Sequence, residues 1–161
     1  MVETDVLFRI ADAAEDDGRL DFARQLFERG AALGNVECLT RLARLHDAGL
    51  GTSVNKREAM RLFRQAWRQG SSVVAANNIA ILYREAGNHR AMFRWFQRAA
   101  DAGDGSAQLD LAKCYLEALG VRGDSARALR CLAVAIQSIY ITEAQREEAV
   151  ILMEGLAPRS V

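Results

Sequence analysis

The sequence predicts an all-α fold built from repeated helical hairpins, and three observations support this. The chain of 161 residues is 50% apolar and 26% charged and has a single proline, a composition typical of a helical protein. Glycines suited to ending helices, Gly34, Gly70 and Gly103, are 36 and 33 residues apart, a period typical of helical arrays. The same residue types recur at fixed distances from these glycines, which indicates that one structural unit is repeated.

The first helix of each hairpin follows its glycine and carries a series of small, large, small and aromatic residues. The spacing places each series on one face of a helix. One residue is inserted after Gly70, and His46 stands where an aromatic residue is expected. The three series are Cys38, Leu42, Ala43 and His46; Ala75, Ile79, Ala80 and Tyr83; and Ala107, Leu111, Ala112 and Tyr115.

The second helix of each hairpin leads up to the next glycine. Apolar residues recur along it, again on one helical face. They are Ala23, Leu26 and Ala31; Ala59, Leu62 and Trp67; Met92, Trp95 and Ala100; and, in a fourth hairpin that starts at Asp124, Ala128, Cys131 and Ala135. A single short hairpin cannot bury its apolar face, whereas stacked hairpins bury one another's faces.

The boundaries follow from this register. We predict one repeat domain over 1–161, with units at approximately 4–35, 36–72, 73–105 and 106–140. A further helix at 142–156, opened by a capping box of Thr142 and Gln145, is expected to cap the end of the stack.

The two long connections carry the most specific signal. HDAGLGTSVNKREA (46–59) and YLEALGVRGDSARA (115–128) place glycine, a capping residue and alanine at the same intervals. Gly51 and Gly120 are suited to a left-handed backbone, and Asn55 and Asp124 are suited to capping the following helix. Glu58, three residues after Asn55, is expected to complete a capping box. The connections around Gly18 and Gly87 are shorter.

This pattern resembles the Sel-one-like repeat, a relative of the tetratricopeptide repeat, over residues 4 to 140. The matching residues are Ala107, Leu111, Ala112, Tyr115, Gly120, Val121, Asp124 and Ala128, with Trp95, Ala99, Ala100 and Gly103 in the preceding unit. His46 and Cys131 depart from the pattern, as do the two short connections. The resemblance implies a right-handed α-solenoid that acts as a protein-interaction adaptor or scaffold. It also implies a bacterial setting in signalling, secretion, the cell envelope, host interaction or toxin immunity.

No catalytic, cofactor or metal site is predicted. The three cysteines form no CxxC pair and are expected to be buried reduced thiols, and the two histidines lie in different units without a ligand cluster. GLGTS (49–53) lacks the lysine and serine or threonine of a phosphate-binding loop. Asp124 in the tripeptide Arg122-Gly123-Asp124 is interpreted as a helix cap. We therefore expect a protein that is not an enzyme.

The concave side of a tetratricopeptide-like array is lined by first helices, and the resemblance places a partner there. The surface is predicted to be mixed, with apolar residues beside charges, which suits a peptide or helix of another protein. The predicted residues are Phe8, Asp12, Glu37, Thr40, Arg44, Asn77, Ile81, Arg84, Leu109, Lys113 and Leu116. Ordinary exposed residues are the competing interpretation.

Two arginine ridges follow the outer faces of second helices and offer an alternative site. Like charges at this spacing cost a helix about 0.2–0.5 kcal/mol per pair. The ridges are Arg57, Arg61, Arg64 and Arg68, and Arg90, Arg94 and Arg98. A solvated face, an acidic protein and a nucleic acid are the three interpretations. The net charge of zero and the absence of interleaved aromatic residues weigh against nucleic acid.

Location and partner identity depend on weaker signals. The N-terminus has neither the basic start nor the apolar core of a signal peptide, and no apolar run reaches the roughly 20 residues of a membrane span. We therefore expect a cytoplasmic protein. The sequence predicts neither the identity of the partner nor the oligomeric state.

Overall fold

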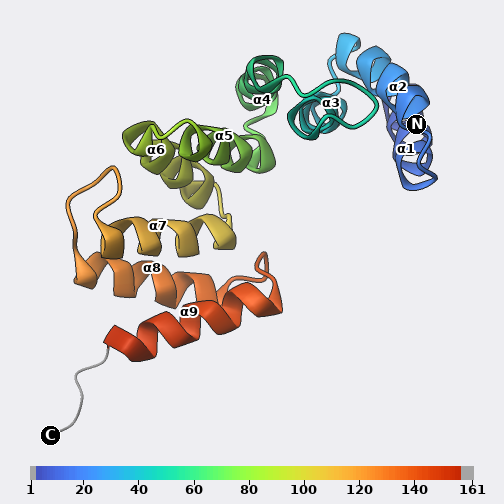
Figure 1. The fold of residues 1–161 in the computed structure, drawn as a ribbon. Helices are drawn as coiled ribbons and strands as arrows, with labels where there is room; N and C mark the ends of the chain where they lie inside the picture. The colour runs from blue at the N-terminus through green and yellow to red at the C-terminus, as the bar shows by residue number, and fades with distance from the viewer. Residues whose placement is uncertain (1–2, 157–161) are drawn as a thin grey trace, which may run out of the picture. The chain divides into compact units, whose positions relative to one another are not determined.

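The computed structural model describes residues 3–156, and all regular secondary structure in this range is α-helical (Figure 1). The helices alternate as first and second members of hairpins, followed by one more. They are α1 (Glu3–Asp16), α2 (Leu20–Ala32), α3 (Val36–Ala48), α4 (Lys56–Gly70), α5 (Val73–Glu85), α6 (His89–Asp101), α7 (Gly105–Glu117), α8 (Ser125–Gln137) and α9 (Glu143–Leu156). The all-α repeat fold predicted from the sequence is confirmed.

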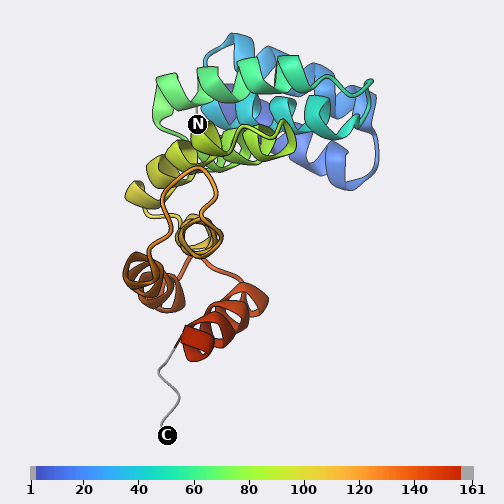
Figure 2. The same cartoon turned by 60° about the vertical axis from the view of Figure 1, so that its left-hand side comes forward.

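The chain divides into two compact units, one up to Ala75 and one from Ala76, so the division falls inside α5. In the first unit α1 packs on α2, α2 on α3 and α3 on α4. In the second unit α6 packs on α7, α7 on α8, and α9 on both α8 and α7, which lie side by side in Figures 1 and 2. The single repeat domain over 1–161 stays a prediction, and its ends, 1–2 and 157–161, lie outside the described residues.

The predicted helical register is confirmed by burial. The small positions Ala43, Ala80 and Ala112 of the first helices have no exposed surface. In the second unit Ala112 belongs to a cluster in which it packs with Leu109 of the same helix, Leu132 of α8 and Ala149 of α9. Small side chains let the helix axes approach closely, so the sequence periodicity translates directly into helix packing.

The two long connections fold alike because each needs glycine at the same place. Gly51 (φ 63°) and Gly120 (φ 71°) have left-handed backbones. A Cβ atom on Gly51 would lie 2.8 Å from the carbonyl carbon of Leu20, and one on Gly120 would lie 2.0 Å from the carbonyl oxygen of His89. Each connection therefore packs against the start of the preceding second helix, and only glycine fits there.

The predicted caps are confirmed with one correction. The side chain of Asn55 accepts a hydrogen bond from the Glu58 amide (3.0 Å), and that of Asp124 accepts one from the Arg127 amide (2.9 Å). The Glu58 carboxylate does not return to Asn55, because the Asn55 amide already donates to the carbonyl of His46 (2.7 Å). Glu58 binds Arg61 instead.

A second correction concerns the end of α4. Gly70 is the last residue of the helix, and Ser71 (φ 49°) takes the left-handed position that follows it. The helix therefore runs one residue further than the glycine anchor predicted. This extension accounts for the residue inserted after Gly70 in the repeat.

The last helix, α9, is held to the second unit by its inner face and by an arginine. Ala149 is buried, and Leu152, Met153 and Leu156 pack against the cluster formed with α7 and α8. Its predicted capping box is present, since the Thr142 amide donates to Oε1 of Gln145 (3.1 Å). Arg146 donates to the carbonyl oxygens of Ile136 and Ser138, which satisfies acceptors at the end of α8.

Candidate functional site

The first helices of the first unit form a shallow pocket of about 330 Å³, which we call the first-unit pocket. It combines residues from α1, α3 and the start of α5. Its lining is Phe8, Val36, Glu37, Thr40, Arg41, Arg44, Ser72 and Val74. Four of these, Phe8, Glu37, Thr40 and Arg44, belong to the surface predicted from the sequence, so the structure brings these four together.

The floor of the first-unit pocket is apolar with two hydroxyl groups. Phe8 is half-buried, and its ring centre lies 6.1 Å from that of Phe27. Thr40 is only 7% exposed, and its hydroxyl donates to the carbonyl of Val36 (2.9 Å) and lies 3.4 Å from Oγ of Ser72. Val74 is 53% exposed. The pocket therefore offers apolar contact over most of its area and few polar groups.

The rim of the first-unit pocket contains both paired and unpaired charges. Arg41 forms ion pairs with Asp12 and Glu15 of α1, and its guanidinium carbon lies 5.9 Å from the centre of the Phe8 ring. Arg44 and Glu37 are exposed and form no ion pair with any residue in 3–156. Asp12 thus joins α1 to α3 through its ion pair with Arg41, whereas Arg44 and Glu37 are available to a ligand.

First helices of the second unit are likewise joined by ion pairs. Arg84 of α5 lies 3.6 Å from Asp110 of α7, and Lys113 of α7 lies 2.7 Å from Glu148 of α9. Burial raises the pKa of the Asp110 carboxyl above its ordinary value, although Arg84 and Lys113 oppose this shift. A smaller pocket of about 220 Å³ lies here, lined by Arg84, Met92, Phe96, Asp110, Lys113, Cys114, Glu117 and Leu119.

The predicted surface needs a correction at Leu109. This residue is 2% exposed and packs in the cluster with Leu132 and Ala149, so it is not an exposed anchor. Leu116 is half-buried against the same cluster. In α5, Ile81 is half-buried, and Oδ1 of Asn77 is buried without a hydrogen-bond partner among the described residues.

Sequence reasoning missed the acidic and basic partners of these helices. Arg41 and Asp110 occupy the same place in the repeat, seven residues after Gly34 and Gly103. Each finds an opposite charge on the preceding first helix, Asp12 and Glu15 for Arg41 and Arg84 for Asp110. A search for opposite charges between successive first helices would have found them.

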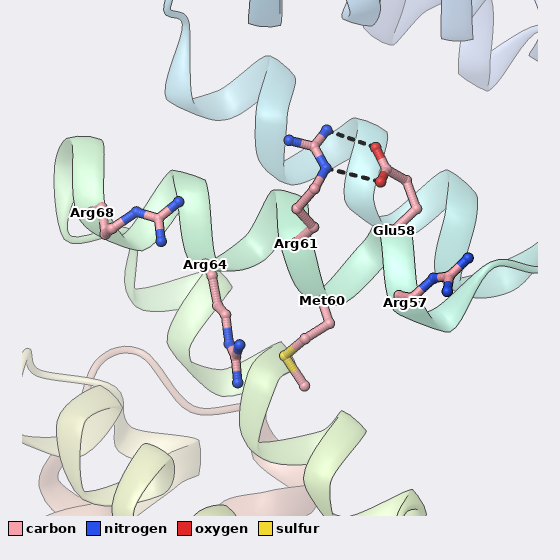
Figure 3. A pocket seen from close by; sticks show the side chains of 6 residues that line it. All are labelled: Arg57, Glu58, Met60, Arg61, Arg64 and Arg68. Atoms are coloured by element: carbon pink, nitrogen blue, oxygen red, sulfur yellow. Dashed lines mark hydrogen bonds and ion pairs between the residues drawn. The ribbon is translucent and has the colours of Figure 1, made fainter.

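The outer face of α4 carries the predicted arginine ridge and a pocket of about 440 Å³ (Figure 3). Its lining is Arg57, Glu58, Met60, Arg61, Arg64 and Arg68. Arg61 donates two hydrogen bonds to Glu58, from Nε (2.9 Å) and Nη2 (2.7 Å). This pairing, with weaker contributions from the charges of His46 and Arg57, lowers the pKa of Glu58.

The second ridge lies on α6 in the other unit. Arg90, Arg94 and Arg98 are all exposed. The guanidinium of Arg98 lies 4.5 Å from the centre of the Trp95 ring, a cation–π contact within the same helix. Because the two ridges belong to different units, each is treated as a separate surface.

The buried cysteines hold protonated thiols. Cys38 and Cys114 are buried, and burial raises the pKa of Cys38 to about 11 and that of Cys114 to about 12. Both are therefore protonated at neutral pH, which confirms the prediction that they are buried thiols; Cys131 is half-buried. Within 3–156 no three His, Cys, Asp or Glu residues gather in a way that could hold a metal ion. None of the described helices is long and apolar enough to cross a membrane.

Comparison with known proteins matches the repeat architecture. A family model described as the Sel1 repeat matches residues 18–35, 36–71, 93–104 and 105–138. No curated protein is significantly similar to the chain.

Solved structures give the same fold at low identity. A Sel1 repeat protein from Oxalobacter formigenes is 21% identical with a TM-score of 0.79, covering 95% of this chain and 63% of that one. The protective antigen c5321 of uropathogenic Escherichia coli, described as displaying an SLR fold, is 24% identical with a TM-score of 0.73, covering 83% of this chain and 30% of that one. The MamA protein is 21% identical with a TM-score of 0.60, covering 95% and 89%. The chain thus spans less than two thirds of the first two proteins.

Proposed function

The chain belongs to the Sel1 repeat family, whose fold generally serves as a protein–protein interaction scaffold, and on this premise we propose that it is a non-catalytic adaptor. The adaptor binds a peptide or a helical segment of another protein. The binding site is the first-unit pocket between α1, α3 and the start of α5.

One observation favours the first-unit pocket over the other candidate surfaces. Its floor is apolar, and its rim has charged side chains that form no ion pair with any described residue. Phe8, Val36 and Val74 provide apolar contact, and Arg44 and Glu37 provide opposite charges at the rim. A volume of about 330 Å³ is at the lower end of pockets that bind small molecules and suits an anchor side chain better. Peptide recognition commonly combines such an anchor with a polar rim.

The ion pairs narrow the set of residues that contact the partner. Asp12, Arg84 and Lys113 are engaged with neighbouring first helices, so their side chains stabilise the packing of the repeats. Within the second unit Asn77, Ile81 and Leu116 remain proposed contacts of secondary importance. Leu109 is removed from the set because it is buried.

The experiment compares two double variants with matched exposure. Val74→Gln with Arg44→Gln alters the first-unit pocket, and Val134→Gln with Arg130→Gln alters the outer face of α8. Val74 and Val134 are 53% and 52% exposed, and glutamine avoids a charge at either helix end. Exposed substitutions shift stability by less than about 0.5 kcal/mol, so both variants should fold normally.

The probes are peptides selected from a random displayed library on the purified protein. We expect the pocket variant to bind them about tenfold more weakly and the α8 variant to bind them unchanged, as measured by fluorescence anisotropy. Equal affinity of the two variants would place the peptide site elsewhere and refute the proposal.

The setting of this adaptor is proposed to be bacterial and cytoplasmic, in signalling, secretion, envelope, host-interaction or toxin-immunity pathways. Two similar structures come from bacteria, which supports the proposed bacterial setting. One of them is described as a protective antigen. Affinity purification with the two double variants, followed by mass spectrometry, would identify partners lost only with the pocket variant.

Nucleic-acid binding through the arginine ridges is the alternative function. The run of four arginines on α4 favours it. A ligand held by phosphate contacts loses affinity steeply with salt, whereas a peptide with an apolar anchor loses much less. A salt titration therefore separates the two functions.

A further inference from the structure

The outer face of α4 is a positively charged surface that helix packing does not require. Arg57, Arg61, Arg64 and Arg68, which we call the arginine face, follow one another by four, three and four residues. They form one stripe about 16 Å long. The packed side of α4 consists of Ala59, Leu62, Phe63 and Ala66, all buried.

The charge of the arginine face is only partly neutralised. The pocket on this face contains one carboxylate, that of Glu58, against four guanidinium groups. Glu58 is held by both hydrogen bonds from Arg61, and its lowered pKa keeps it ionised at neutral pH. Arg57 and Arg68, at the two ends of the stripe, form no ion pair with any residue that the structure describes. In Figure 3 the dashed lines from Glu58 lead to Arg61 and not to Arg57 or Arg68.

We propose that the arginine face is a second docking surface, distinct from the first-unit pocket, and that its occupant is an acidic α-helix of a partner protein. A helix lying along α4 has the same rise per residue, so carboxylates spaced by four, three and four residues lie opposite the four arginines. Charge complementarity of this kind selects the partner and its register.

Two features of the arginine face favour a helix over a nucleic acid. Glu58 lies within the stripe and repels a phosphate backbone, which carries a charge at every nucleotide, whereas a helix carries carboxylates only in line with the arginines. Met60 supplies a flexible apolar side chain to the same pocket, and no aromatic ring lines it for base stacking. A side chain of the docked helix contacts Met60.

The test uses two alanine-based helical peptides of 20 residues and a DNA probe. One peptide carries four glutamates spaced by four, three and four residues, and the other has the same composition with the glutamates spread around the helix. A single-stranded DNA of 20 nucleotides is the third probe. Affinities for the full chain are measured by fluorescence anisotropy at several salt concentrations.

The protein variants are matched in charge. Arg57→Gln with Arg68→Gln removes the ends of the arginine face, and Arg9→Gln with Arg29→Gln removes two exposed arginines from α1 and α2. We expect the striped peptide to bind about tenfold tighter than the spread one, and the first variant alone to lose that advantage. The Val74→Gln/Arg44→Gln protein should bind the striped peptide normally, which separates this surface from the first-unit pocket.

Three outcomes would overturn the proposal. Equal binding of the striped and spread peptides would mean that charge alone, without helical register, decides. Equal loss in both arginine variants would mean that the net charge of the protein decides. DNA binding that is tighter than that of the striped peptide, and that falls steeply with salt and with Arg57→Gln/Arg68→Gln, would assign the face to nucleic acid.

Discussion

Ala118 is a residue held in a backbone conformation that its side chain disfavours. It follows α7 with φ 54°, at the place where the other long connection has Gly49 with φ 72°. Both residues donate their amide to the last turn of the helix, Ala118 to Cys114 and Gly49 to Leu45. The repeat thus needs a left-handed residue here, and alanine meets that need with strain of about 1–2 kcal/mol.

Replacing Ala118 by glycine should therefore stabilise the protein. Relief of strain exceeds the added flexibility of the unfolded chain, which opposes it by about 0.4–1 kcal/mol. We expect Ala118→Gly to raise the free energy of unfolding by about 0.5–1 kcal/mol in urea denaturation. Gly120→Ala in the same connection should instead destabilise strongly, because its Cβ would meet the His89 carbonyl. A less stable Ala118→Gly would show that this turn has another conformation.

At the scale of helices, the sequence predicted features that depend on spacing within one helix and missed the ion pairs between different helices. The caps at Asn55 and Asp124 and the buried alanines depend on spacing along one chain segment, and they are confirmed. The pairs Arg41 with Asp12 and Glu15, Arg84 with Asp110, and Lys113 with Glu148 join different helices. Their formation depends on which side chains face each other, information that a single helical pattern lacks.

Asp110 of α7 faces Arg84 of α5, and two opposing effects act on its carboxyl: burial and the attraction of nearby cations. Its raised pKa means that burial outweighs the attraction of Arg84 and Lys113, so the folded state disfavours the charged carboxylate. Stability from this group is therefore present below the unfolded pKa and is lost as pH rises through the folded pKa.

Asp110→Asn should remove the loss of folding stability that ionisation of Asp110 causes as pH rises. At pH 7 we expect a higher melting temperature than that of the wild type, because the neutral amide fits the buried position without the cost of a charge. Well below the unfolded pKa of about 3.9, where the wild-type carboxyl is protonated in both the folded and the unfolded state, the difference should vanish. Lys113→Gln, which alters the more exposed pair with Glu148, serves as the comparison and should change stability little. An Asp110→Asn protein that melts lower at pH 7 would mean that the pair with Arg84 outweighs burial.

Across the whole molecule, the sequence predicted the repeats better than the exposed surface. The repeated helices and their register follow from periodicity, and residues 3–156 of the structure confirm them. The predicted surface was wrong at Leu109, the sixth residue after Gly103, which is 2% exposed; Thr40, the sixth after Gly34, is 7% exposed and lines the first-unit pocket. Stacking turns Leu109 and Thr40 toward a neighbouring helix, whereas Asn77, at the equivalent place in the unit that follows Gly70, is only half-buried. A position carried over from a related repeat cannot reveal this, because the angle between helices sets the exposure.

The remaining question at this scale is whether the repeats unfold together. Stability in repeat proteins is a sum of the stability of each repeat and of the contacts between neighbours, so damage should stay local. Ala112→Leu overpacks a fully buried position in the second unit, and Ala43→Leu does the same in the first, each costing about 1–3 kcal/mol. In hydrogen exchange, we expect Ala112→Leu to reduce protection most in α7, α8 and α9 and least in α1 and α2. Ala43→Leu should give the reverse order. Uniform loss of protection in every helix for both variants would contradict this expectation and support a single cooperative domain, since a cooperative domain opens all of its amides in one global unfolding event.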